Sequence, residues 1–257
     1  MRLSPLIASG LLIVVAGCGA TREEQAPEAD VVRVLSSNGV KAVIDDVQPE
    51  IERAIGRPLS IEFSTAATLK TKIEQGEPFD VAILTPGLLH ELTAAGHVVA
   101  DSQLSLARAG VGVAARAGAP KADVGTADAL KRTLLEARSV AFTAEGQSRR
   151  TIEQAFEELG IAEAMRPKVL LTGPMGGPAA VAKGEAELAM TLISEILPIE
   201  GVQFLGPLPD GLQQYVSFAA ARGTHAKDAA AADALLRTLS GPTIAAALEA
   251  HGMESVE

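Results

Sequence analysis

The chain has 257 residues, 47% of them hydrophobic, which is enough to bury a core in one large or two smaller lobes. Its formal net charge is −10 and no block of basic residues occurs in it, which argues against nucleic acid as a partner. Tryptophan is absent and aromatic residues make up 3%, which disfavours a stacking surface for bases or sugars.

The first 17 residues predict a signal peptide. Arg2 gives a short basic start, residues 3–15 are mostly apolar, and this stretch is too short to predict a membrane-spanning helix. The run Val-Ala-Gly before Cys18 resembles the lipobox of bacterial lipoproteins, which implies that Cys18 is lipidated and anchors the chain to a membrane. Alternatively the signal peptide is a plain one and Cys18, the single cysteine, is incidental. Residues 18–30 are polar and acidic and predict a flexible tether.

From residue 31 onward, strand-like and helix-like segments alternate. Short apolar runs predict strands at 31–35, 59–63 and 79–84. Apolar residues at helical spacing predict helices at 40–55, 68–75 and from Pro86, and Gly56 fits a helix C-terminal cap. This order indicates a mostly parallel sheet flanked by helices.

A second series of α/β segments follows. The predicted strands lie at 109–116, 139–142, 168–171, 188–192 and 215–220. The predicted helices lie at 126–137, 152–160, before Gly184, at 229–239 and at 242–251. We therefore expect an α/β protein in which residues 31–110 and 202–257 form lobe 1 and residues 111–201 form lobe 2. The strands at 109–116 and 215–220 are the candidates for a two-stranded hinge.

Turns rich in hydroxyl and glycine residues follow three of the predicted strands, at 36–39, 64–68 and 143–148. Each precedes a helix, whose first backbone N–H groups are unpaired and carry partial positive charge, so such a turn can hold an anion without a lysine. The turns lie at the carboxyl ends of strands, where two lobes could close on one ligand. The loop 173–178 is either a fourth wall of this cleft or only a change of chain direction.

Segments 32–40, 75–83, 186–190, 239–244 and 251–253 resemble the periplasmic solute-binding proteins of the molybdate-binding type. The resemblance extends from Val31 to the C-terminus. It implies a two-lobed type II periplasmic-binding-protein fold with one oxyanion in the cleft, and a membrane permease of an ABC importer as partner. It also implies a periplasmic protein, and we expect a monomer.

The resemblance places the family's ligand contacts at Gly39, Ala66, Ser148 and Leu192, so three hydroxyl-bearing residues of the family are missing here. Nearby hydroxyl and amide groups, with Thr68 and Thr191 among them, are available as substitutes. Arg149, at a predicted helix start, either suits a carboxylate in bidentate geometry or lies solvated on the surface. The candidate anion-binding residues are Ser36, Ser37, Asn38, Gly39, Thr65, Ala66, Ser148, Arg149 and Leu192.

The resulting prediction is capture of a molybdate- or tungstate-like oxyanion for an ABC importer. The alternatives are a small organic carboxylate as ligand, or a ligand sensor that docks a membrane receptor instead of a permease. No nucleophile–base pair is evident, so we do not expect an enzyme. No cluster of metal-ligating residues predicts a metal site. The glycines at 110 and 112 lie inside a predicted strand rather than a strand-to-helix turn, so no cofactor is expected.

Overall fold

The structure is a computed structural model, and it describes residues 31–256. The predicted signal peptide, Cys18 and the tether 18–30 lie outside the described residues. Within the described part of the chain, no helix is both long and apolar enough to cross a membrane.

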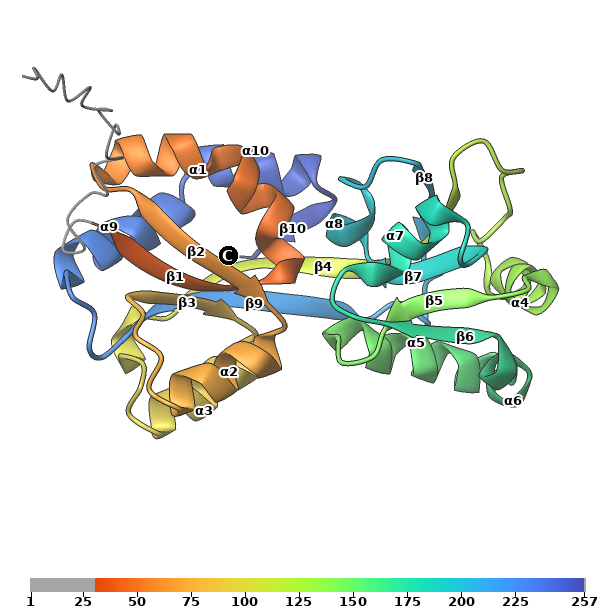
Figure 1. Cartoon of the computed structure of the whole chain (residues 1–257), viewed down its shortest axis with the longest axis horizontal. Helices are drawn as coiled ribbons and strands as arrows, with labels where there is room; N and C mark the ends of the chain where they lie inside the picture. The colour runs from red at the N-terminus through yellow and green to blue at the C-terminus, as the bar shows by residue number, and fades with distance from the viewer. Residues whose placement is uncertain (1–30, 257) are drawn as a thin grey trace, which may run out of the picture.

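Two α/β lobes lie side by side and share one mixed sheet (Figure 1). The strands are β1 (Val32–Ser37), β2 (Leu59–Ser64), β3 (Val81–Leu84), β4 (Leu104–Arg116), β5 (Val140–Thr143), β6 (Val169–Thr172), β7 (Leu188–Leu192), β8 (Val202–Pro207), β9 (Tyr215–Arg222) and β10 (Met253–Ser255). They run in the order β2-β1-β3-β9-β4-β7-β5-β6, and both β8 and β10 pair with β4. Parallel pairs join β1 to β2 and β3, and β5 to β6 and β7.

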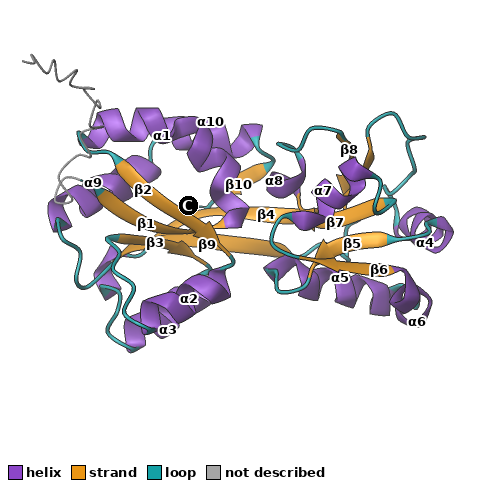
Figure 2. Ribbon diagram, in the orientation of Figure 1, coloured by secondary structure: helices purple, strands orange, loops and turns teal. Residues whose placement is uncertain are grey.

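Helices cover both faces of each half of the sheet (Figure 2). They are α1 (Lys41–Ile55), α2 (Ala66–Glu74), α3 (Pro86–Ala94), α4 (Ala127–Glu136), α5 (Gln147–Glu158), α6 (Ala162–Met165), α7 (Gly176–Lys183), α8 (Ile193–Ile196), α9 (Ala229–Leu239) and α10 (Pro242–Ala250). In the first lobe, α1, α9 and α10 lie on one face and α2 and α3 on the other. The predicted cap Gly56 ends α1 with a left-handed φ of 67°, a conformation that glycine adopts without steric cost.

Strand β4 crosses from one lobe to the other. Its pairing with β9 ends at Gly110 opposite Tyr215, and its pairing with β7 begins at Val111 opposite Leu192. By this pairing, the crossing from the first lobe falls between residues 110 and 111. Segment 202–207, expected in lobe 1, instead pairs as β8 with the second half of β4. The reason is backbone hydrogen bonding: β7 satisfies one side of this half of β4, and β8 satisfies the other.

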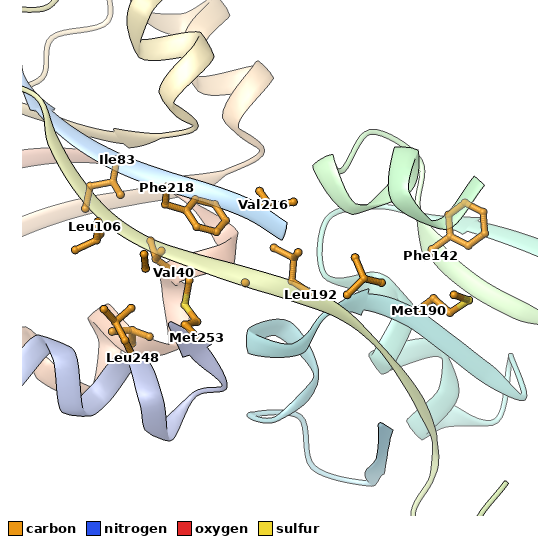
Figure 3. Packing of buried hydrophobic residues seen from close by; sticks show 14 of the residues in the cluster. Val40, Ile83, Leu106, Phe142, Met190, Leu192, Val216, Phe218, Leu248 and Met253 are labelled. Atoms are coloured by element: carbon orange, nitrogen blue, oxygen red, sulfur yellow. The ribbon is translucent and has the colours of Figure 1, made fainter. Parts of the chain in front are cut away.

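The core is continuous through the crossing. Its largest cluster contains Val40 and Phe218 from the first lobe together with Leu192, Met190 and Phe142 from the second. Figure 3 shows Phe218 on β9 beside Val40, with Leu192 at the start of the second lobe. This packing fixes the positions of the turns that face each other across the gap between the lobes.

Candidate functional site

A pocket lies where the turns of the two lobes meet. Turns after β1, β2, β5 and β6 contribute to it, together with the end of β7, α8 and β9. The lining residues are Ser37, Asn38, Gly39, Thr65, Ala66, Ala67, Thr143, Glu145, Gly146, Gln147, Ser148, Pro174, Met175, Leu192, Glu195 and Phe218. Each of the three hydroxyl- and glycine-rich turns therefore supplies residues to a single pocket, together with the loop 173–178.

The first turn has no room for a side chain at position 39. A Cβ added to Gly39 would lie 2.3 Å from Cζ of Phe218 and 3.0 Å from Cδ1 of Leu192. These two side chains occupy the space that a serine side chain would need. The carbonyl oxygen of Gly39 accepts a hydrogen bond of 2.7 Å from the buried hydroxyl of Ser194 in the other lobe. At position 39 the first turn therefore presents apolar packing and no hydroxyl.

The second turn presents a threonine at the start of α2. The Oγ1 of Thr65 accepts a hydrogen bond from the backbone N–H of Thr68 at 3.2 Å and lies 2.8 Å from the Thr68 hydroxyl oxygen. This is an ordinary N-terminal cap, and it orients the first turn of α2 toward the pocket. Ala66 lines the pocket and has no polar side-chain atom to offer, so any contact there is made by the backbone.

The third turn divides the predicted residues between two surfaces. Ser148 is buried, with 3% of its surface exposed, and lines the pocket. The guanidinium of Arg149 instead donates to the carbonyl oxygen of Ala144 at 2.6 Å and to the carboxylate of Glu153 at 2.8 Å. Arg149 lines a separate hollow beside Phe156. Successive helical residues are rotated by about 100°, so a helix that turns Ser148 toward the pocket turns Arg149 away from it.

The loop after β6 forms the fourth wall through Pro174 and Met175. Met175 has a φ of 56°, the left-handed region, and is the only non-glycine residue with positive φ among residues 31–256. Such conformations cost roughly 1–3 kcal/mol and cluster at binding sites. Helix α7 begins directly after it.

The sequence analysis missed Glu195, which is buried in the pocket wall with 9% of its surface exposed. The hydroxyl of Thr191 donates a hydrogen bond to its Oε2. Burial raises the pKa of the Glu195 carboxyl, and the Thr191 hydrogen bond opposes this only in part. The available signal was a single acidic residue inside the otherwise apolar and hydroxyl-bearing run 188–197. Phe218 was missed as well.

Ser36 does not reach the pocket. It is fully buried, and its hydroxyl donates to the Ser37 carbonyl oxygen at 3.4 Å. Side chains in a strand alternate between its two faces, so Ser36 and Ser37 cannot both point the same way. The remaining predicted residues, Ser37, Asn38, Gly39, Thr65, Ala66, Ser148 and Leu192, all line the pocket.

No lysine, arginine or histidine is among the described residues that line the pocket, and its two ionisable groups are Glu145 and Glu195. An anion held here would therefore depend on hydroxyls and on the backbone N–H groups at helix starts. The space between the lining atoms, its open mouth included, is about 460 Å³. Such a narrow pocket suits a small molecule.

Comparisons with known proteins bear on the family and the fold of the chain. A family model described as bacterial extracellular solute-binding protein matches residues 32–254. An aconitate isomerase from Pseudomonas sp. is 30% identical over 257 residues, covering 98% of this chain and 97% of that protein.

Two solved structures show the same fold. The periplasmic molybdate-binding protein of Azotobacter vinelandii superposes with a TM-score of 0.75 at 15% identity, covering 88% of this chain and 100% of that one. The sulfate-binding protein SubI of Mycobacterium tuberculosis H37Rv gives 0.70 at 16% identity, covering 88% and 87%. These likenesses confirm the predicted two-lobed periplasmic-binding-protein fold.

Proposed function

This chain belongs to the bacterial extracellular solute-binding proteins, and we propose that it captures a small organic anion with two or three carboxylates in the cleft between its lobes. Proteins of this family bind small ligands outside the cytoplasmic membrane and work with ABC transporters.

The observation that carries the proposal is the convergence of Ser37, Thr65 and Ser148, each beside the start of a helix, on one pocket without a basic side chain. Helix starts attract negative charge through their unpaired N–H groups and their dipole. Each hydrogen bond to a charged group contributes about 1.5–3 kcal/mol. Several such donors are enough to hold a carboxylate without an arginine.

The apolar part of the pocket favours an organic ligand over a metal oxyanion. Phe218 and Leu192 fill the space beside Gly39, and a carbon skeleton can pack against them, whereas the oxygens of molybdate or tungstate cannot use such a surface. The full-length relative named aconitate isomerase also supports a carboxylate ligand. Molybdate and tungstate remain the rival ligands, because neighbours in fold bind them.

Isothermal titration of the purified protein with trans-aconitate, citrate, molybdate, tungstate and sulfate tests this proposal. We expect binding of a polycarboxylate and none of molybdate. Ser148→Ala should weaken polycarboxylate binding about 10- to 150-fold, because one hydrogen bond to a charged group is lost. The matched control is Ser60→Ala, at an exposed position on β2 away from the pocket. Binding of molybdate or tungstate with no polycarboxylate bound would overturn the organic ligand.

We also propose that the protein delivers its ligand to an ABC permease as a monomer anchored through a lipidated Cys18. A role as a sensor would use the same cleft and a different membrane partner. Uptake of the bound ligand by cells with and without this gene separates the two roles: lost uptake supports delivery to a permease.

A second candidate function is isomerisation of an unsaturated tricarboxylate, favoured by Glu195 in the pocket wall and by the aconitate isomerase relative. An ionised Glu195 would accept a proton from a carbon next to a carboxylate, the double bond would move by one position, and the same proton would return to the far carbon. Nothing is oxidised and no water is consumed. Proton NMR of trans-aconitate incubated with the protein tests this directly, with Glu195→Gln as the inactive control.

A further inference from the structure

Glu195 combines three features in one residue. Its side chain lines the pocket, it is buried, and the Thr191 hydroxyl engages one of its two carboxyl oxygens, Oε2. The other carboxyl oxygen is thereby left for the pocket. The hydroxyl of Ser194, its neighbour on α8, donates a hydrogen bond to the carbonyl oxygen of Gly39 in the opposite lobe. This bond holds α8 in the pocket wall.

Residues 31–256 place no compensating positive charge beside Glu195, whose carboxyl is affected only by burial and by the Thr191 hydrogen bond. Helix α8 packs mainly on β4, β7, β8 and the turn Asn38–Val40, and the last three carry no ionisable residue. Of the two arginines in β4, Arg108 pairs with Glu254 at 2.5 Å, and Arg116 lies at the far end of the strand beside Gly184. The other ionisable residue among those that line the pocket is the exposed Glu145.

An ionised Glu195 would face a bound carboxylate in a site of low dielectric constant, where like charges repel strongly. We propose that Glu195 meets the ligand as a neutral carboxylic acid and donates its proton as a hydrogen bond to a ligand carboxylate, so that capture is coupled to protonation. This deepens the proposed function and rests on it. Burial raises the pKa of Glu195, the direction that favours the protonated form.

A consequence is that Glu195 acts as a specificity residue. Two carboxyl groups that share one proton form a short, strong hydrogen bond. A ligand oxygen that accepts this hydrogen bond has Glu195 as its donor. The turn at Gly39 offers no hydroxyl for this purpose. Capture should then be strongest in mildly acidic surroundings and should weaken as pH rises, even though the ligand itself stays ionised throughout.

The test is titration calorimetry of the purified protein with trans-aconitate and with citrate from pH 6 to pH 9. Each pH is run in two buffers of different ionisation enthalpy, which counts the protons taken up on binding. For the wild-type protein we expect affinity to fall about tenfold per pH unit once pH exceeds the pKa of Glu195 in the free protein. Proton uptake should approach one per ligand in that range.

Three variants complete the test. Glu195→Gln keeps a donor but cannot titrate, so its affinity should stay constant within about twofold across the range, without proton uptake. Glu195→Ala should bind weakly at every pH. Glu145→Gln, which changes the other carboxyl that lines the pocket, should retain the wild-type pH dependence. Thermal unfolding of each variant verifies that it is folded.

The outcomes separate this inference from the proposed function. Wild-type binding that is independent of pH and takes up no proton overturns the role of Glu195 while capture of a carboxylate stands. An unchanged pH slope in Glu195→Gln does the same. Failure of the wild-type protein to bind any polycarboxylate at any pH overturns both.

Discussion

At the scale of single residues, Gly39 shows how the pocket departs from the pattern that the sequence resembles. A serine side chain there would press against Phe218 and Leu192, which already fill the space next to the backbone. A glycine in a loop is often explained by its conformational freedom, but this one has no positive φ. It is required by the close approach of two side chains.

We predict that Gly39→Ser destabilises the protein by about 1–3 kcal/mol, the usual cost of overpacking a core, and does not create molybdate binding. Urea denaturation measures the first effect and calorimetry the second. The control is Gly87→Ser, because a Cβ at Gly87 meets no atom within 4 Å. Wild-type stability in Gly39→Ser would show that Phe218 moves aside easily and would contradict this explanation.

The residues of the pocket were predictable to different degrees. Ser37, Thr65 and Ser148 were found because hydroxyls before a helix are a local pattern with a local cause. The sequence leaves two positions open for Arg149, in the cleft or on the helix surface. The structure has it on the surface, because the rotation of α5 turns its side chain away from the pocket and Glu153 binds it there. Glu195 left only a weak signal, a single acidic residue in the run 188–197, because its burial results from strands that are distant in sequence.

At the scale of elements, the crossing strand β4 is held by a side chain as well as by its neighbours. The amide of Gln213 accepts from the backbone N–H of Val111 at 2.8 Å and donates to the carbonyl oxygen of the same residue at 2.8 Å. These two hydrogen bonds lie where one edge of β4 passes from pairing with β9, at Gly110 opposite Tyr215, to pairing with β8, at Gly112 opposite Pro207. They satisfy backbone groups that neither strand reaches.

We predict that Gln213→Ala destabilises the protein by about 1–3 kcal/mol, because the buried N–H of Val111 loses its partner. Hydrogen exchange at Val111 should accelerate by about 5- to 150-fold, which matches that free energy. The neighbouring Gln214→Ala is the control, since Gln214 makes only an exposed contact with Gln154. Equal exchange rates at Val111 in both variants would refute a role of Gln213 at the crossing.

Elements with a pattern of their own were predictable, whereas β8, β10 and the first five residues of β4 were not. Helices α1 and α9 and strand β4 have periodic patterns or extended apolar runs that can be read without tertiary information. Strands β8 and β10 form by pairing with the edges of β4. Their formation therefore depends on β4 and cannot be read from the sequences of β8 and β10 alone. This is also why the predicted return to lobe 1 at residue 202 comes too early.

At the scale of the whole molecule, the two lobes are joined behind the pocket by buried contacts. Ser194 bonds Gly39 across the lobes, and a Cβ at Gly252 would lie 2.6 Å from a side-chain carbon of Ile193 in α8. Helix α8 therefore touches both the pocket wall and the C-terminal turn of the first lobe. The ionisation of Glu195, on that same helix, should influence the stability of the entire protein.

The sign of this influence follows from linkage. Burial raises the pKa of Glu195 above its ordinary value of 4.5, so above that pH the unfolded chain releases a proton that the folded protein still holds. Stability must then decrease as pH rises from this value toward the raised pKa, with a slope of up to about 1.4 kcal/mol per pH unit. The effect ends once the folded protein also releases the proton.

We predict that Glu195→Gln removes this decrease and leaves the protein more stable than the wild type at pH 8, with a smaller difference at pH 5. The free energy of unfolding, measured in urea from pH 5 to pH 8, gives both curves. Glu145→Gln is the control, because its exposed carboxyl lies in the same pocket without the burial. Parallel curves for the wild type and Glu195→Gln would mean that Glu195 is ionised in the folded protein. In that case Glu195 could not donate a hydrogen bond to a ligand carboxylate, and the coupling of capture to its protonation would fail.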